Sequence, residues 1–169
     1  MNIGFRGRIG LLESLKKFCE EKTASICLPM SLQKGDQETA ERAPEVYKMR
    51  LPSSSSAKKY APYILIQFVN GMDKQPHGMN SGSTSLVRFI FCVYNDNEEQ
   101  GAIMLLNLME TIRIALMKAV VIDQRYKLDT DSGLESLAYL DDTAPYFAGE
   151  LVGTFIEAPI EREVNLREI

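Results

Sequence analysis

The chain contains a single histidine, His77, and lacks the short motifs that identify common phosphate, dinucleotide and zinc sites. It has no Gly-x-x-x-x-Gly-Lys-Ser/Thr, no HExxH, and no Gly-x-Gly-x-x-Gly that follows a strand. His77 lies between Pro76 and Gly78 in a predicted loop, where no neighbouring group orients it as a general base. These absences argue against hydrolytic, nucleotide-binding and zinc-dependent chemistry. We expect a protein that is not an enzyme and holds no cofactor.

Cysteine is scarce as well. Cys19, Cys27 and Cys92 are odd in number, show no CxxC spacing, and each lies in an apolar pattern. Such a set fits reduced thiols in the core better than disulfides or zinc ligands.

Neither sign of charge dominates the sequence. There are 19 basic and 23 acidic residues, a net charge of −4, and the basic residues are scattered. This distribution argues against the phosphate attraction on which nucleic-acid binding relies. No window approaches the roughly 18 apolar residues of a membrane span, and the two arginines near the start are not followed by the apolar stretch of a signal peptide. We therefore expect a soluble, cytoplasmic protein with no membrane contact.

The composition is that of a folded domain. Of 169 residues, 45% are hydrophobic and 25% are charged, and a chain of this length buries roughly 70% of its unfolded surface. We expect one domain over residues 1–169.

Two segments have helical periodicity. The first lies between Arg8 and Lys22, and the second runs from Glu98 to Lys118 with Asn97 as its N-cap. The expected core-facing residues are Ile9, Leu12, Leu15, Phe18 and Cys19 in the first helix and Ala102, Leu105, Leu106, Leu108, Met109, Ile112, Ala115 and Leu116 in the second.

The clearest strand signal is the segment Leu86–Tyr94. Side chains alternate between faces, so an apolar set from Val87 to Val93 meets the helices, while Arg88 and Tyr94 lie on a mixed second face. Further strands are expected at Ala24–Pro29, Glu45–Leu51, Tyr63–Val69, Tyr126–Leu128, Leu134–Tyr139 and Gly149–Ala158. The Tyr63–Val69 strand reads as covered on both faces and near the centre of the sheet.

The pattern predicts an α+β fold, with a mainly antiparallel, mixed sheet of about four to five strands and two helices packed on one face. Long loops are expected at 30–59 and 70–84, and residues 160–169 form a flexible tail. Residues 30–59 read either as a disordered surface excursion or as an interaction loop that orders in an assembly.

Acidic residues cluster in three places. Residues 96–99 read as helix capping rather than a metal site. Asp129-x-Asp131 begins like a calcium loop but lacks the glycine and glutamate that complete it. Asp141-Asp142 lies in a turn and reads as a solvated pair. No metal ligand or catalytic residue is predicted.

Three features together resemble tail terminator (tail completion) proteins of long-tailed bacteriophages and prophages. They are the strand Leu86–Tyr94 with its acidic turn, the helix core Leu105-Leu-Asn-Leu-Met-Glu-Thr-Ile-Arg113, and Pro145-Tyr-Phe-Ala-Gly-Glu150 leading to Gly153-Thr-Phe155 and Pro159. The likeness covers roughly residues 61–163.

The resemblance implies a small α+β subunit that assembles as a ring, usually a hexamer, on the end of the tail tube. The ring stops tube polymerisation and presents a surface for head-tail joining. Its partners would be further copies of itself, the tail tube protein and a head connector or stopper protein. It would act in virion assembly in the bacterial host cytoplasm and remain as a structural protein in the virion neck.

We predict that the second sheet face and the adjoining loops form the contacts of this ring. The candidate interface residues are Arg88, Tyr94, Lys58, Lys59, Lys74, His77 and Arg162. Two alternatives stay open. One is another neck protein, a head-tail connector or stopper. The other is a small-molecule-binding or enzymatic α+β domain with a pocket lined by Tyr63, Phe68 and Tyr94.

Overall fold

The structure is a computed structural model that describes residues 7–30, 40–52, 60–76, 82–140 and 143–161. In chain order the elements are α1 (Gly7–Thr23), β1 (Leu28–Pro29), β2 (Glu41–Arg42), β3 (Glu45–Lys48), β4 (Tyr63–Lys74), β5 (Gly82–Tyr94), α2 (Glu98–Ala119), β6 (Val121–Ile122), β7 (Tyr126–Leu128), β8 (Leu134–Ala138) and β9 (Tyr146–Glu157).

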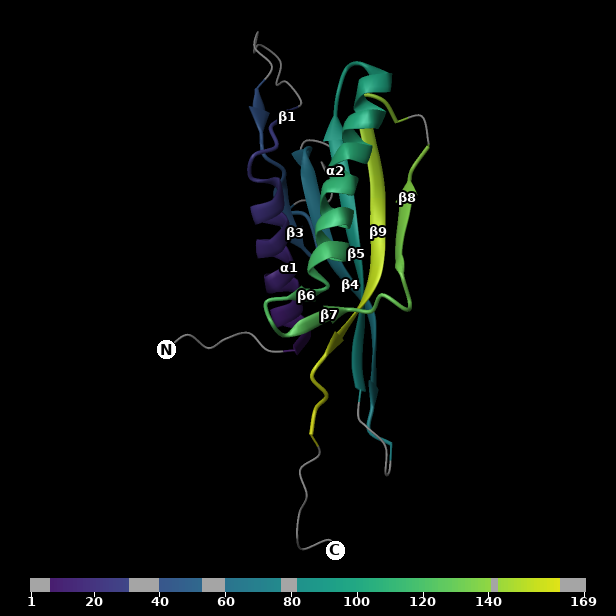
Figure 1. Ribbon diagram of the computed structural model, residues 1–169. Coiled ribbons are helices and arrows are strands. Elements are labelled where there is room, and N and C mark those ends of the chain that lie inside the picture. Colours follow the sequence, from purple (N-terminus) through teal and green to yellow (C-terminus); the bar gives the residue numbers. More distant parts are fainter. Residues whose placement is uncertain (1–6, 31–39, 53–59, 77–81, 141–142, 162–169) are drawn as a thin grey trace, which may run out of the picture.

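One mixed sheet organises the fold. Its strand order is β3-β4-β5-β9-β7-β6, and β8 also pairs with β9, which makes seven strands among the described residues. The β3–β4 pair is parallel and the other pairs are antiparallel. Both helices lie on the same face of the sheet (Figure 1). The expected α+β class is confirmed. The sheet has seven strands rather than four to five: β3 and β7 match short strands that the sequence predicted at 45–51 and 126–128, whereas β6 was not predicted.

The alternation in β5 decides which face meets the helices. Val87, Phe89, Phe91 and Val93 are all completely buried, as predicted, in one cluster with Leu15 of α1 and residues of α2. Asn97 caps α2 as expected, since its side chain accepts a hydrogen bond from the Gln100 backbone N–H at 3.0 Å. The acidic residues beside it therefore serve the helix end.

The predicted helix faces were partly wrong. Ile9 is 62% exposed and Leu106 is 54% exposed, and Ala102 also faces outward. In α1, Leu11, which was not among the predicted core residues, is buried together with Leu12 and Leu15. Several outward-facing side chains of α2 are large and apolar although they are not part of the core.

Two predicted loops contain regular structure. The expected loop over 70–84 is a β-hairpin arm, because β4 and β5 remain paired from Asn70↔Leu86 to Lys74↔Gly82 beyond a bulge at Val69. The arm projects from the body of the molecule (Figure 1). Within 30–59 the structure places β2, which was not predicted, and β3, which confirms the strand expected at 45–51 and is an edge strand of the main sheet. Residues 31–39 and 53–59 lie outside the described residues.

The thiols differ in environment. Cys19 and Cys92 are buried, whereas Cys27 is exposed, which corrects the expectation of three core thiols. All three are free. Cys27 follows the end of α1 in a connection that packs less deeply than either the helix or the sheet. Burial raises the pKa of the Cys19 thiol.

The Asp129 turn is held by its own side chain. The Asp129 carboxylate accepts hydrogen bonds from the Asp131 and Ser132 backbone N–H groups at 3.1 and 3.3 Å and from the Ser132 hydroxyl at 2.5 Å. These bonds lower the pKa of Asp129. The carboxylate is thus used as a turn acceptor. The Asp141-Asp142 pair lies outside the described residues.

Candidate functional site

Arg88 lies on the sheet face that the helices leave open. One guanidinium nitrogen donates to Gln67 Oε1 at 3.0 Å, and Arg88 Nε lies 3.3 Å from Glu150 Oε2. The Arg88 side chain is 40% exposed, whereas that of Glu150 is only 15% exposed. The Nε and Oε2 atoms have no hydrogen-bond partner, so the two side chains interact as an ion pair without hydrogen-bond geometry. Arg88 thus links β5 to β4 and β9 and keeps part of its guanidinium accessible.

A pocket of about 790 Å³ opens beside Arg88. Its wall is largely apolar, and Gln67 closes one side by donating to the Met49 carbonyl at 3.0 Å. The apolar lining residues are Met49, Leu51, Pro52, Leu65, Phe68 and Val69. Two arginines, Arg50 and Arg88, also line this recess. A recess with apolar side chains and cationic groups suits a partner segment in which an acidic residue adjoins an apolar one.

Tyr94 belongs to an aromatic cluster further along the same face. Its ring packs against Tyr146 with centroids 5.4 Å apart, and its hydroxyl donates to Asp96 Oδ1 at 2.8 Å. That hydrogen bond raises the pKa of Tyr94. The cluster is built on Ala61, Tyr63, Leu65 and Cys92, with Tyr47, Leu51, Tyr60, Ile90 and Tyr146 packed around them. Arg88 and Tyr94 share the face, but six residues of strand separate them by about 20 Å.

The other predicted interface residues do not join them. Lys74 is exposed on the last rung of the β-hairpin arm, opposite Gly82. Lys58, Lys59, His77 and Arg162 lie outside the described residues. The structure therefore gathers Arg88 and Tyr94 on one face and places Lys74 at the far end of the arm.

The pocket expected of a ligand-binding domain is not formed by its three predicted residues. Tyr63 and Tyr94 pack in the aromatic cluster, whereas Phe68 packs against the main core and also borders the pocket beside Arg88. The reason is the alternation of the strand, which places residues 63 and 68 of β4 on opposite faces.

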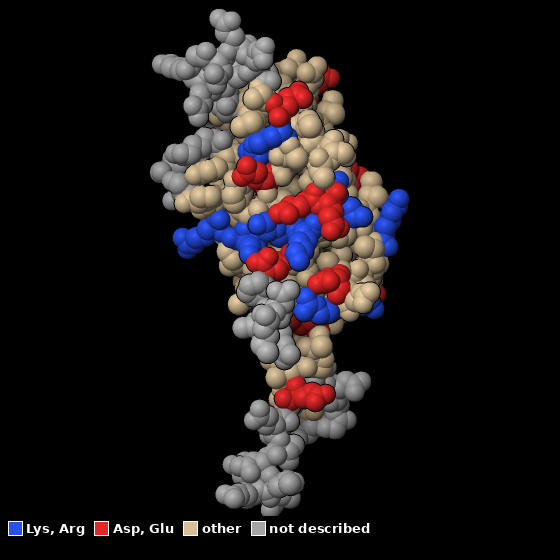
Figure 2. All heavy atoms as spheres, turned by 90° about the vertical axis from the view of Figure 1, so that its left-hand side faces the viewer, with Lys and Arg blue, Asp and Glu red and all other residues tan. Residues whose placement is uncertain are grey.

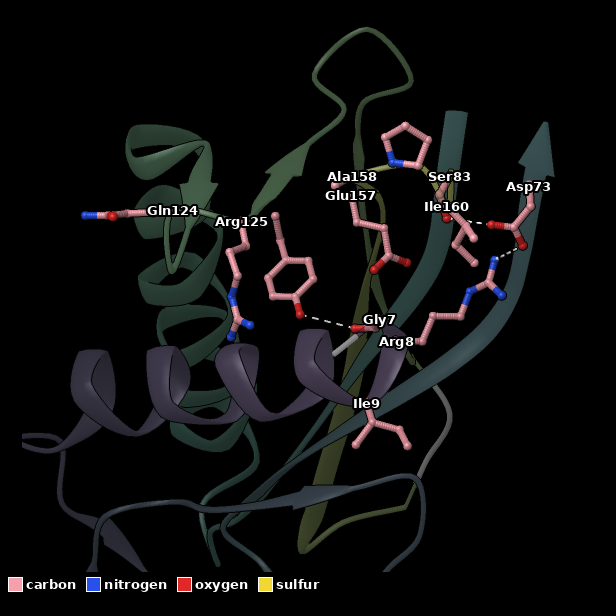
Figure 3. A pocket seen from close by; sticks show the side chains of 12 residues that line it. Gly7, Arg8, Ile9, Asp73, Ser83, Gln124, Arg125, Glu157, Ala158 and Ile160 are labelled. Atoms are coloured by element: carbon pink, nitrogen blue, oxygen red, sulfur yellow. Dashed lines mark hydrogen bonds and ion pairs between the residues drawn. The ribbon is translucent and has the colours of Figure 1, made fainter. Parts of the chain in front are cut away.

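A second pocket, of about 850 Å³, lies where α1 begins, beside the outer rungs of the arm and the end of β9. Figure 3 shows Arg8 reaching Asp73 across it, with a nitrogen–oxygen distance of 3.0 Å. Arg8 also donates to the Ser85 hydroxyl at 3.1 Å, and Ser83 donates to Asp73 at 2.6 Å. On the other side of the pocket, the Tyr126 hydroxyl donates to the Gly7 carbonyl at 3.1 Å.

These contacts fasten the start of α1 to the arm. Gly71 permits the close approach, because a Cβ there would lie 2.2 Å from an Arg8 guanidinium nitrogen. The Ser83 hydroxyl binds the Asp73 carboxylate, and the Ser85 hydroxyl binds the Arg8 guanidinium. Neither serine is therefore arranged as an activated nucleophile.

Sequence reasoning missed this fastening, although a signal was present. Ser83 and Ser85 continue the same alternating face as Val87 and Phe89, and both are buried. A polar residue on a buried face needs a hydrogen-bond partner, and that requirement pointed toward a charged group from elsewhere in the chain.

The surface around α1 carries both signs of charge. On that side of the molecule, Figure 2 shows Lys and Arg interspersed with Asp and Glu. Among the described residues, no group of three or more His, Cys, Asp and Glu side chains is arranged to hold a metal ion. Within the same part of the chain, neither helix has the length and apolar character needed to cross a bilayer.

No protein-family model matches the chain, and a search of curated proteins found none similar to it in sequence. The likeness to tail terminators therefore depends on the order and type of the chain's own motifs.

Proposed function

We propose that the protein is a tail terminator of a bacteriophage or prophage, which caps the tail tube as a ring, stops its polymerisation and offers the surface to which the head is joined. The proposal combines the resemblance of residues 61–163 with one structural observation. The observation is a pair of unlike sheet edges on opposite sides of a single domain.

The two edges in question are β3 and β8. Among the described strands of the main sheet, β3 pairs only with β4 and β8 pairs only with β9, so each has one side without a strand partner. The short strand β6 also has a single partner, β7, and lies on the same side of β9 as β8. Their sequences, Glu-Val-Tyr-Lys and Leu-Glu-Ser-Leu-Ala, are different. Two unlike edges suit a head-to-tail contact, which closes into a ring when each copy is rotated by a constant angle.

The second sheet face supplies a further surface for the tube or the head. The apolar recess beside Arg88 suits an acidic residue flanked by apolar ones, and such a contact needs no reactive side chain. A ring that acts by geometry requires complementary shape, edges and charge rather than a reactive side chain.

Deletion of the gene from its phage or prophage tests the proposal. We expect particles with tails of variable, excessive length and heads that are not joined to them, visible by negative-stain electron microscopy. Tails of normal length on firmly joined heads would refute it.

Arg88 variants test the placement of the contact. Arg88→Gln keeps a group that can bind Gln67 but removes the charge, and we expect it to weaken binding to purified tail tubes in a pull-down assay. Lys127→Gln, which removes a charge at an exposed position of β7, is the matched control. Unchanged tube binding and ring assembly in Arg88→Gln would move the contact elsewhere. Binding to the portal complex but not to the tube would favour the connector alternative.

A further inference from the structure

The edge strand β8 has little of the usual protection against pairing with a strand of another chain. Its sequence, Leu-Glu-Ser-Leu-Ala, holds one charged residue, Glu135, and neither lysine nor proline. Four of its five residues are exposed, including Leu137 at 48%. Among the described elements, none lies beyond β8 at this margin of the sheet (Figure 1). Edge strands are normally protected by lysine, proline, a bulge or a covering element, so β8 is open to a further strand.

The other free edges of the described main sheet differ from β8 in charge, regularity or length. In β3, Lys48 forms an ion pair with Glu13 of α1. In the arm, the outer edge of β4 has a bulge at Val69 and ends in Lys74. The third edge, β6, is only two residues long. Of these edges, β8 is the one best suited to pairing with a strand of its own kind.

The ladder between β8 and β9 determines which backbone groups β8 offers. Directly after β8, the Tyr139 N–H donates to the Ala148 carbonyl of β9 at 2.9 Å. The N–H and C=O groups of successive residues point to alternate sides of a strand, so those at the odd-numbered positions of β8 also face β9. Those of Ser136 and Ala138 therefore point away from β9, toward the open side.

The segment is complementary to itself about Leu137. In an antiparallel pair centred there, Leu137 faces Leu137 of the second copy, Ser136 faces Ala138, and Glu135 faces Tyr139. The outward-pointing groups of Ser136 and Ala138 then form the hydrogen-bonded pairs. Leu137 and Glu135 fall in the non-hydrogen-bonded pairs, where side chains are closer. Opposed residues share a face of the sheet, and no like charges are opposed.

Neighbouring registers fit less well. A centre at Ser136 sets Glu135 against Leu137, and a centre at Glu135 opposes two carboxylates. A centre at Ala138 shortens the described overlap to residues 136–140. The register about Leu137 uses residues 134–140.

We propose that β8 pairs antiparallel with β8 of a second copy, about a two-fold axis that passes between the two Leu137 residues. The pairing joins the two main sheets into one. It covers Leu137 and sets Leu140, which is 94% exposed, opposite Leu134 of the second copy. One pair of strands is a small contact, so we expect association at micromolar or higher concentrations.

This pairing is distinct from the proposed ring. A two-fold contact uses the same edge on both copies and closes at two, whereas the ring joins two different edges. The pairing therefore goes beyond the proposed function, does not depend on it, and concerns the protein free of the tail tube. Because β8 has one open side, a β8 pair must separate before β8 can join a ring.

Sedimentation equilibrium of the full chain over a range of concentrations provides the first test. We expect the wild type to form dimers. Ala138→Pro removes an outward-pointing N–H and leaves the ladder to β9 intact, and Leu137→Lys places two cations at the axis. We expect each to raise the dissociation constant at least about tenfold. Val121→Lys is the matched control, because it introduces lysine at a 49% exposed apolar position of β6, and it should keep the wild-type constant. A monomeric wild type, two variants that dimerise like the wild type, or a control that dissociates equally would overturn the proposal.

Disulfide trapping tests the register and the occupant. Cys27→Ser first removes the exposed thiol. In that background Leu137→Cys places two thiols at the axis, where opposed Cβ atoms lie about 4.5 Å apart and can be bridged by a disulfide. We expect oxidation with copper phenanthroline to give a covalent dimer on a non-reducing gel. Glu135→Cys, on the same face but about 13 Å from its counterpart, is the matched control and should stay monomeric. Absence of the Leu137→Cys dimer, or equal trapping in the control, would overturn the proposal, including the case in which β8 binds β3 of another copy instead.

Discussion

The two faces of β5 have different occupants. On the helix face, Val87, Phe89, Phe91 and Val93 are excluded from solvent by both helices. On the second face, Arg88 and Tyr94 are half-buried; Arg88 donates a hydrogen bond to Gln67 of β4, and Tyr94 donates one to Asp96 in the turn that follows β5.

The two faces of β5 therefore differ in how their side chains are packed. The helix face holds the domain together through contacts that depend on volume, so it has little freedom to change. The second face is stabilised by hydrogen bonds, an ion pair and aromatic packing that leave atoms accessible. It is the face on which a partner can be recognised without dismantling the core.

The strongest test of this comparison is Phe89→Ala. The ring is completely buried and packs against Phe155 with centroids 6.4 Å apart. Its removal leaves a cavity, and we expect a loss of about 3–5 kcal/mol in the free energy of unfolding, measured by urea denaturation. Leu86→Ala, on the half-buried second face, should cost about 1 kcal/mol or less. Similar losses at both positions would erase the distinction between the faces.

A smaller effect is expected for Arg88→Met. This change leaves the largely buried Glu150 without its cation, and we expect a loss of about 1–2 kcal/mol after allowing for solvent around the guanidinium. The double variant Arg88→Met/Glu150→Met should recover most of it, because no charge is left unpaired. If the double variant is no more stable than the single one in the same urea titration, then packing rather than charge holds this part of the face.

The smallest effect concerns Asp73 at the fastening of α1. The Ser83 hydroxyl, followed by Arg8, lowers the pKa of Asp73. A carboxyl whose pKa is lowered by folding stabilises the protein above its unfolded pKa, and this contribution is lost as the pH falls through the folded value. Asp73→Asn should therefore be slightly less stable than wild type at neutral pH and equal to it in strong acid. A difference that persists in acid, seen in urea midpoints across the pH range, would contradict this assignment.

Much of the fold follows from local patterns. The alternation in β5 and the capping of α2 by Asn97 were predictable because each depends on residues close together in the chain. The β-hairpin arm was missed because Asn70-Gly71 resembles a turn, whereas the structure continues the ladder past a bulge at Val69. The error at Ile9 arose because periodicity gives the spacing of a helix face but not its orientation toward the sheet.

The sequence by itself determined the α+β class, the positions of the two helices and long strands, and the mixed character of the face that bears Arg88. Each depends on periodicity, capping or side-chain alternation, which act over a few residues. Only the tertiary structure decided that Arg8 forms an ion pair with Asp73, that Glu150 forms one with Arg88, and that apolar side chains on the outer side of α2 remain exposed. Those facts depend on contacts between residues distant in sequence, and no local rule specifies them.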